Sequence, residues 1–171
     1  MPDFLQNAGR ELPFILLLLA LLGLRWRVTP RVSLFINAPM EAIFPQLDFR
    51  EGEEQRWQRT RVKCQVMDED SQTYQLTFVT ALATGAVQTS TAQFRIERRE
   101  PPHLIDIRRA GLDGQSHNNQ LLRMLGELSP EASGTRLRLT YEWGPRPLLA
   151  QLMARADLWG SAYRLKGVAE T

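Results

Sequence analysis

The stretch "TRLRLTYEWGPRPLLAQLMARADLWGSAYRLKGVAE", residues 135–170, decides the fold because two different periodicities meet in it at a single break. Apolar side chains occupy every second position from Leu137 to Trp143, which predicts a strand with one buried face. The pair Gly144-Pro145 then ends the strand, and Pro147 suits the first turn of a helix. The sequence therefore predicts a strand that leads directly into a long C-terminal helix.

Along that helix, apolar and small side chains recur at spacings of three and four, which predicts one broad apolar face. We expect this face to lie across a β-sheet. Gly160 falls on it, although a glycine costs a helix about 1 kcal/mol relative to alanine. Its position indicates either close approach or open space there. The predicted face consists of Leu149, Leu152, Met153, Ala156, Trp159, Gly160 and Tyr163.

The segments before residue 135 also alternate between apolar and polar side chains, which is typical of an antiparallel sheet with one covered face. The segment 120–128 also fits helical spacing, but the turn "SPEASGT" joins it to the strong strand and favours a β-hairpin. Counting the strand at 135–143, we expect about six or seven strands. The earlier ones are predicted at 31–39, 60–68, 73–80, 86–100, 101–109 and 120–128.

Between the first two strands, "APMEAIFPQL" at residues 38–47 has a helical pattern that Pro45 should interrupt, leaving two short helical pieces. The predicted class is thus α+β. A curved antiparallel sheet grips the C-terminal helix, and two short helices follow the first strand. An apolar helix precedes the domain at the N-terminus.

The N-terminal apolar run, residues 12–24, fits three interpretations. A secretory signal has a basic start and a small-residue cleavage site, whereas this segment follows Asp3 and Glu11 and ends in "RWR". A buried core helix is amphipathic, whereas "FILLLLALLGL" is apolar all round. A membrane segment fits best, although such a helix covers only about 20 Å of a roughly 30 Å hydrocarbon core.

The predicted membrane anchors are Arg25, Trp26 and Arg27, whose long basic and aromatic side chains reach the headgroups and extend the membrane contact over residues 12–28. The positive-inside tendency then puts the following domain on the cytoplasmic side. We predict two parts, a membrane-associated segment at 1–30 and a folded domain at 31–171.

Charge and chemistry exclude several classes of function. Four arginines and two acidic residues fall within residues 1–31, so the remainder is neutral although the whole chain carries +2. Nucleic-acid binding is not expected, because aromatics do not interleave with the basic side chains. The single cysteine, Cys64, is predicted to be an inert core thiol. His103 and His117 lack partners at metal-ligand spacing, so no metal and no cofactor are predicted. Asp106 is expected on the wet face, in a solvated ion pair.

The order of elements resembles the START-like superfamily, the polyketide cyclase/dehydrase and lipid-transport group also called SRPBCC proteins. The resemblance is carried by "VSLFINAPMEAIFPQL" at 32–47, by "LLRMLGELSPEASGTRLRLTYEW" at 121–143 and by "LKGVAE" at 165–170. It implies a helix-grip fold over about residues 30–170, with an apolar pocket between sheet and helix. These are patterns of fold, which specify architecture more than activity.

Small side chains on both walls make such a pocket physically reasonable, although large aromatics could equally fill it. The candidate pocket residues are Gln88, Ser90, Ala92, Tyr141, Met153, Ala156, Trp159, Gly160 and Tyr163. We expect a membrane-tethered protein that binds a hydrophobic small molecule or lipid, with no catalytic residue assigned. The alternative is a cyclase/dehydrase-like enzyme, in which Gln88, Ser90, Tyr141 and Tyr163 would converge on one point. A third reading is an interaction module whose pocket is vestigial.

Overall fold

The computed structural model describes residues 24–171 except 49–53, 56–60, 69–71, 82–85 and 112–119. Its described part contains one antiparallel sheet of nine strands, in the order β1-β9-β8-β7-β6-β5-β4-β3, with β2 also paired to β9. The strands are β1 (Arg25–Val28), β2 (Arg31–Ile36), β3 (Glu54–Gln55), β4 (Arg61–Asp68), β5 (Thr73–Ala81), β6 (Val87–Glu100), β7 (Leu104–Arg109), β8 (Leu121–Glu131) and β9 (Gly134–Pro147). The helices are α2 (Met40–Leu47) and α3 (Leu148–Ala169).

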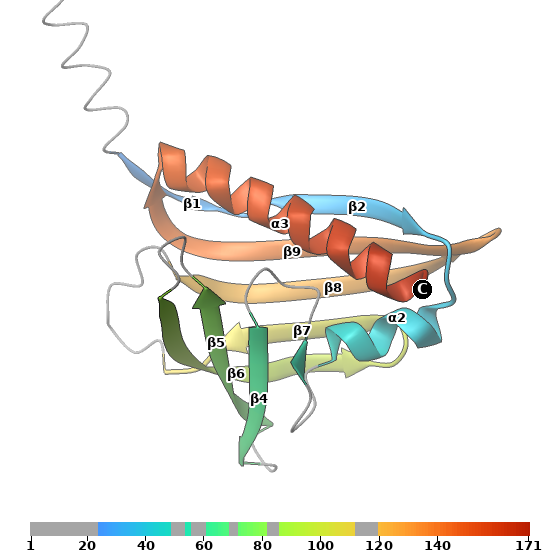
Figure 1. The fold of residues 1–171 in the computed structure, drawn as a ribbon, viewed down its shortest axis with the longest axis horizontal. Helices are drawn as coiled ribbons and strands as arrows, with labels where there is room; N and C mark the ends of the chain where they lie inside the picture. The colour runs from blue at the N-terminus through green and yellow to red at the C-terminus, as the bar shows by residue number, and fades with distance from the viewer. Residues whose placement is uncertain (1–23, 49–53, 56–60, 69–71, 82–85, 112–119) are drawn as a thin grey trace, which may run out of the picture.

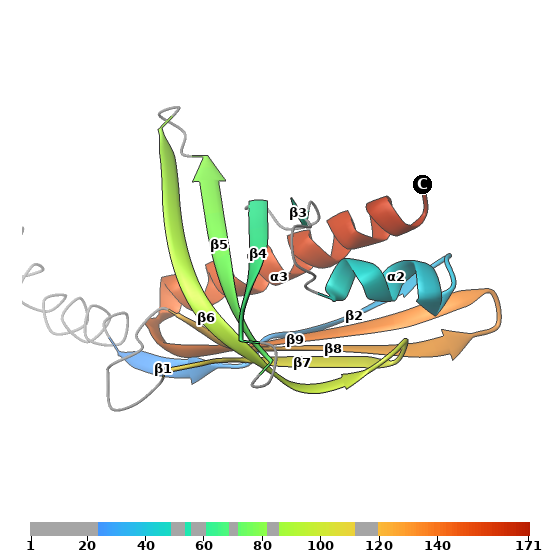
Figure 2. The same ribbon diagram turned by 90° about the horizontal axis from the view of Figure 1, so that it is seen from below.

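The predicted strands are all present, and the two short strands β1 and β3 extend the sheet at its edges. The segment that also fitted a helix is strand β8, as the neighbouring turn indicated. In Figure 2 β4, β5 and β6 bend away from the plane of β7, β8 and β9, toward the side on which α2 and α3 lie. This curvature and the long helix confirm the predicted α+β class.

The helix α2 runs through Pro45, so the predicted interruption at this residue was wrong. Proline removes one N–H from the helix ladder, and its partner would be the carbonyl of Glu41. Glu41 is exposed, so its carbonyl can bond to water. Only one of the two predicted helical pieces is therefore confirmed, and residues 49–53 lie outside the described residues.

A close approach to the sheet explains how α2 is seated. Ile43, Phe44 and Leu47 are buried on its inner side. Beneath them lies Gly126 of β8, where an added Cβ would come within 3.2 Å of the Leu47 Cδ1 atom. The missing side chain at Gly126 therefore makes room for Leu47.

The helix α3 crosses the sheet over β2 and β9, as Figure 1 shows. Lys166 donates from Nζ to the carbonyl oxygen of Phe35 at 3.1 Å, and Glu170 accepts a bond from the Asn37 amide at 2.7 Å. The C-terminal end of α3 is thus bonded to β2 and to the residue that follows it.

The face that α3 presents to the sheet differs from the predicted one, and this prediction was wrong. Trp159 is 43% exposed, Tyr163 57% and Leu149 67%. Both faces have spacings of three and four, so periodicity alone does not separate them. The inner face combines three small residues with two leucines, whereas the aromatic side chains of Trp159 and Tyr163 point outward. The buried face consists of Ala154, Leu158, Ser161, Ala162 and Leu165.

Gly160 makes no close approach to the sheet, because the atoms nearest to an added Cβ would all belong to the guanidinium group of Arg164, at 3.4 Å or more. We therefore expect Gly160→Ala to raise the free energy of unfolding by about 0.5 to 1 kcal/mol through helix propensity. Urea denaturation of the two proteins measures this change. A loss of stability would show that the space at Gly160 is needed.

The residues Arg25, Trp26 and Arg27, with Val28, form strand β1, so the apolar N-terminal run does not extend as a helix through Val28. Strand β1 pairs with the end of β9, where Arg25 lies opposite Pro147 and Trp26 opposite Arg146. Residues 1–23 lie outside the described residues. Within the part that is described, no helix is both long enough and apolar enough to cross a bilayer.

The carboxylate of Asp106 is buried, contrary to the prediction of a solvated pair. It accepts two hydrogen bonds from Arg123, from Nε at 2.7 Å and from Nη2 at 2.5 Å. The ion pair itself was predicted, but the burial of its carboxylate and its two parallel hydrogen bonds were not.

Candidate functional site

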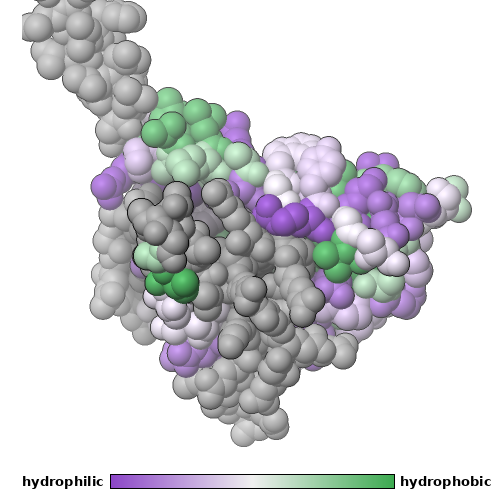
Figure 3. Space-filling view, viewed as in Figure 1, coloured by the Kyte–Doolittle hydropathy of each residue, from purple (hydrophilic) through white to green (hydrophobic). Residues whose placement is uncertain are grey.

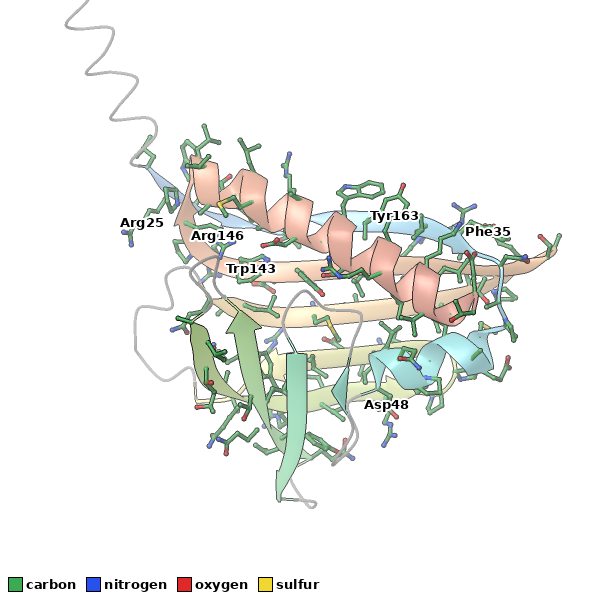
Figure 4. The ribbon with its side chains drawn as sticks, viewed as in Figure 1. Arg25, Phe35, Asp48, Trp143, Arg146 and Tyr163 are labelled. Carbon is green, nitrogen blue, oxygen red and sulfur yellow. The ribbon has the colours of Figure 1, made fainter. Side chains whose placement is uncertain are left out.

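A group of polar side chains lies beneath α3 at the end of β9 that the helix follows. Tyr141 is buried, and its ring meets that of Trp143 edge-on, with centroids 6.4 Å apart. The Cζ atom of Arg146 lies 3.9 Å from the centroid of the Trp143 ring, which is the geometry of a cation–π contact. Figure 4 shows Trp143 and Arg146 below the N-terminal half of the helix. We call Tyr141, Trp143, Arg146 and Ser161 the β9 cluster.

The hydroxyl of Tyr141 is fixed by α3. It forms a hydrogen bond with buried Ser161, and Arg164 donates from Nη2 to the Ser161 Oγ at 3.4 Å. Burial raises the pKa of Tyr141, and the contacts with Ser161 and Arg164 offset only part of this rise. The Tyr141 hydroxyl therefore stays protonated across the ordinary pH range.

Arg146 contributes a buried positive charge. Its Nη1 donates to the carbonyl oxygen of Ala150 at 3.1 Å, and its own carbonyl accepts a bond from Gln151 Nε2 at 3.1 Å. Burial lowers the pKa of Arg146, while Asp157 raises it. A guanidinium group remains charged at physiological pH. The cluster thus holds a cation against an aromatic face, with little exposure to water.

The indole N–H of Trp143 is the chemically informative atom of the cluster. Among the residues that the structure describes, Trp143 Nε1 is buried and has no hydrogen-bond acceptor. A buried donor that is left unsatisfied costs about 1 to 3 kcal/mol. An acceptor oxygen placed here by a ligand would remove that cost and would also lie near the positive charge of Arg146.

The predicted pocket residues are only partly brought together. Tyr141 is in the β9 cluster, whereas Ala92 lines a separate groove of about 300 Å³ with Arg109 and Gln120. Ser90 is exposed on β6, and the side chain of Gln88 lies outside the described residues. The helix residues Met153, Ala156, Trp159 and Tyr163 are exposed on the outer face of α3, and Gly160 is half-buried.

The catalytic set proposed with the enzyme alternative does not converge in the described residues. Tyr141 points under α3, whereas Tyr163 is exposed on the opposite face of the helix, as Figure 4 shows, and Ser90 is exposed on β6. Because Tyr163 lies on the outer face of α3 and Tyr141 lies beneath the helix, the helix separates their hydroxyl groups.

Sequence reasoning missed Arg146 and Ser161 as site residues and treated Trp143 as a core residue. Trp143 alternates with Tyr141, so its side of the strand was visible in the sequence. The sequence predicted that the strand ends at Gly144-Pro145, which was wrong, because β9 continues through Arg146 to Pro147. Ser161 lies outside the predicted apolar face of α3. No sequence signal locates these two.

A second large groove lies on the other face of the sheet. It has a volume of about 490 Å³ and is lined by charges of both signs, among them Arg31, Arg138, Glu127 and Glu142. Within the described ranges no three His, Cys, Asp or Glu side chains are grouped as metal ligands would be.

No protein-family model matches the sequence, and no curated protein matches it. Solved structures do match the fold. The di-domain ARO/CYC BexL from the BE-7585A biosynthetic pathway aligns with a TM-score of 0.58 and 16% identity over 96% of this chain, which spans only 56% of BexL.

Two further structures match over nearly their full lengths. Protein CV1439 from Chromobacterium violaceum has a TM-score of 0.57 and 18% identity, covering 84% of this chain and 97% of that one. The Zhui aromatase/cyclase from Streptomyces sp. R1128 has a TM-score of 0.56 and 17% identity, covering 85% and 94%. At these identities the likeness shows the fold alone, and the chain shares the helix-grip fold of these structures.

Proposed function

We propose that the protein binds a hydrophobic small molecule or lipid whose polar end carries a carbonyl or carboxylate oxygen. The observation that carries this proposal is the buried indole N–H of Trp143, for which the described residues provide no acceptor. The adjacent guanidinium group of Arg146 favours an oxygen with negative charge at the same place. The β9 cluster would therefore orient the polar end of the ligand.

The apolar part of such a ligand would lie along the concave side of the sheet. The side chains there are apolar, but Phe94, Ile107 and Met124 are packed in the core cluster, and the cavity beside Phe94 and Ile107 has a volume of only about 10 Å³. A ligand would therefore have to separate α3 from the sheet to enter. A mostly apolar wall with a few fixed polar groups is typical of small-molecule sites. Two of the similar structures, BexL and Zhui, are named as aromatase/cyclases, which supports a small organic ligand.

The same proposal includes a membrane tether on the cytoplasmic side. The apolar run of residues 12–24 directly precedes β1 in the sequence, and the exposed Arg25 and Arg27 of β1 would meet the headgroups, with Trp26 between them. Tethering raises the effective concentration of a lipid-derived ligand near its binding site.

Two measurements test the binding proposal on the full chain. Organic extraction of the purified protein followed by mass spectrometry should yield a bound hydrophobic compound. For the polar contact, the probe is 11-(dansylamino)undecanoic acid, a fluorescent fatty acid with a carboxylate end. We expect Trp143→Phe to weaken its binding about tenfold, the loss of one hydrogen bond to a buried donor.

The matched control is Trp159→Phe, which changes an exposed tryptophan on the outer face of α3. It should leave the affinity for the probe unchanged. Equal affinities of the Trp143 and Trp159 variants, together with an extract that holds no bound compound, would contradict the proposal.

The enzyme alternative keeps one supporting observation, the protonated hydroxyl of Tyr141 held by Ser161. Such a group can donate a proton to a developing oxyanion. A Tyr141→Phe variant separates the two functions, because a cyclase-like enzyme would lose turnover while retaining its bound compound. A binding protein would show no turnover in either form.

A further inference from the structure

Large apolar side chains are exposed together at one corner of the molecule. They come from the first two turns of α3 and from the start of β1, two segments distant in sequence. Strand β1 brings them together, because Arg25 pairs with Pro147, the residue directly before α3. Figure 3 shows hydrophobic surface gathered over the N-terminal end of α3. This apolar corner consists of Leu24, Trp26, Leu148, Leu149, Leu152 and Met153.

The position of the corner in the chain indicates what covers it. Leu24 is both part of the corner and the last residue of the uncharged run that begins at Leu12. The surface is thus continuous in sequence with the most apolar segment of the protein. A bilayer that takes up that run would meet this corner before any other part of the described domain.

The charge around the corner fits the same partner. Arg25 and Arg27 on β1 and Arg155 on α3 are exposed beside the apolar side chains, and they outnumber the one exposed carboxylate of this part of the helix, that of Asp157. Basic side chains flanking an apolar helix face are typical of surfaces that lie in the interface of an anionic membrane.

We propose that the apolar corner lies in the headgroup region of an anionic bilayer and fixes the orientation of the domain. This deepens the proposed tether, on which it rests, because the tether alone would leave the domain free to rotate. The corner covers the same end of β9 that carries Trp143 and Arg146. Docking there holds the β9 cluster beside the membrane surface.

The test uses the full chain with a cysteine introduced at Leu152→Cys and labelled with an NBD fluorophore. Val168→Cys is the matched control, an exposed apolar position at the far end of the same helix. The unchanged protein, whose one cysteine is Cys64, gives the background labelling. Each protein is mixed with phosphatidylcholine vesicles that contain about a quarter phosphatidylglycerol.

Two readouts keep the tether and the docking apart. Flotation with the vesicles reports attachment, and quenching of NBD by iodide reports exposure to water. We expect the protein to float and iodide quenching at position 152 to fall about fivefold, with quenching at position 168 unchanged, since only the corner enters the interface.

If the protein floats but iodide quenches NBD at position 152 as strongly as it does without vesicles, the tether is supported and the docking of the apolar corner is overturned. Equal protection at 152 and 168 would also overturn the corner as the docking surface. Protein that does not float would overturn both the tether and the docking.

Discussion

Leu158→Ala should lower the free energy of unfolding by about 3 kcal/mol, because it removes a side chain from the centre of the buried face of α3. Leu158 is fully buried and belongs to the same core cluster as Leu139 and Tyr141 of β9. The cavity left under the helix would not be filled by a shift of β9, because β9 is held on both sides by neighbouring strands. For a chain of this size the melting temperature should fall by roughly 6 to 12 °C.

The control for this prediction is Leu149→Ala on the same helix, where the side chain is exposed. Both changes remove the same atoms and leave alanine, which favours the helix, so helix propensity cancels in the comparison. The exposed substitution should alter stability by less than about 0.5 kcal/mol. A larger effect at Leu149 than at Leu158 would mean that α3 presents the opposite face to the sheet.

Arg123→Met should lower the free energy of unfolding by about 2 to 3 kcal/mol, because it leaves the carboxylate of Asp106 buried without its partner. Arg123 provides two parallel hydrogen bonds to this carboxylate. The side chain of Arg123 is 34% exposed, against 6% for Asp106, so the effect should fall below that for a fully buried pair.

A double substitution sharpens this second prediction. Replacing both residues, as Arg123→Met with Asp106→Leu, removes the unpaired buried carboxylate and should recover most of the lost stability. Arg95→Met offers the control, because Arg95 pairs with Glu97 at 2.8 Å on the surface, where an ion pair contributes less than about 1 kcal/mol. Additive losses in the double variant, measured by urea denaturation, would show that the buried pair is not coupled.

The sequence was sufficient for the seven longer strands and for α3, but not for the short strands β1 and β3, for the uninterrupted α2 or for the face that α3 buries. Alternation located the long strands, and the break before Pro147 located the start of α3, because both signals depend on neighbouring residues alone. The outward face of α3 was not predictable in the same way. Leu158 and Trp159 are adjacent and both apolar, and only packing against β2 and β9 decides which of them is buried.

The site was predictable only where it shares the strand pattern. Tyr141 was found because it alternates on β9, whereas Arg146 follows Gly144-Pro145, where the sequence wrongly predicted the end of the strand. The missing acceptor for Trp143 Nε1 is a property of three-dimensional neighbours, so residue type alone does not reveal it. At Pro45 the sequence misled in the opposite direction. A proline is expected to interrupt a helix, but here it removes only one hydrogen bond, and the carbonyl that loses it, that of Glu41, is exposed to water.

The pairing of β1 with β9 connects the segment that precedes β1 mechanically to the β9 cluster. Strand β1 has four residues, and its Trp26 lies directly opposite Arg146. Short terminal strands are the first to open in a sheet. A pull transmitted through residue 24 would peel this ladder first and loosen the backbone that positions Arg146. Tension along the N-terminal segment would thus disturb the β9 cluster before it unfolded the domain.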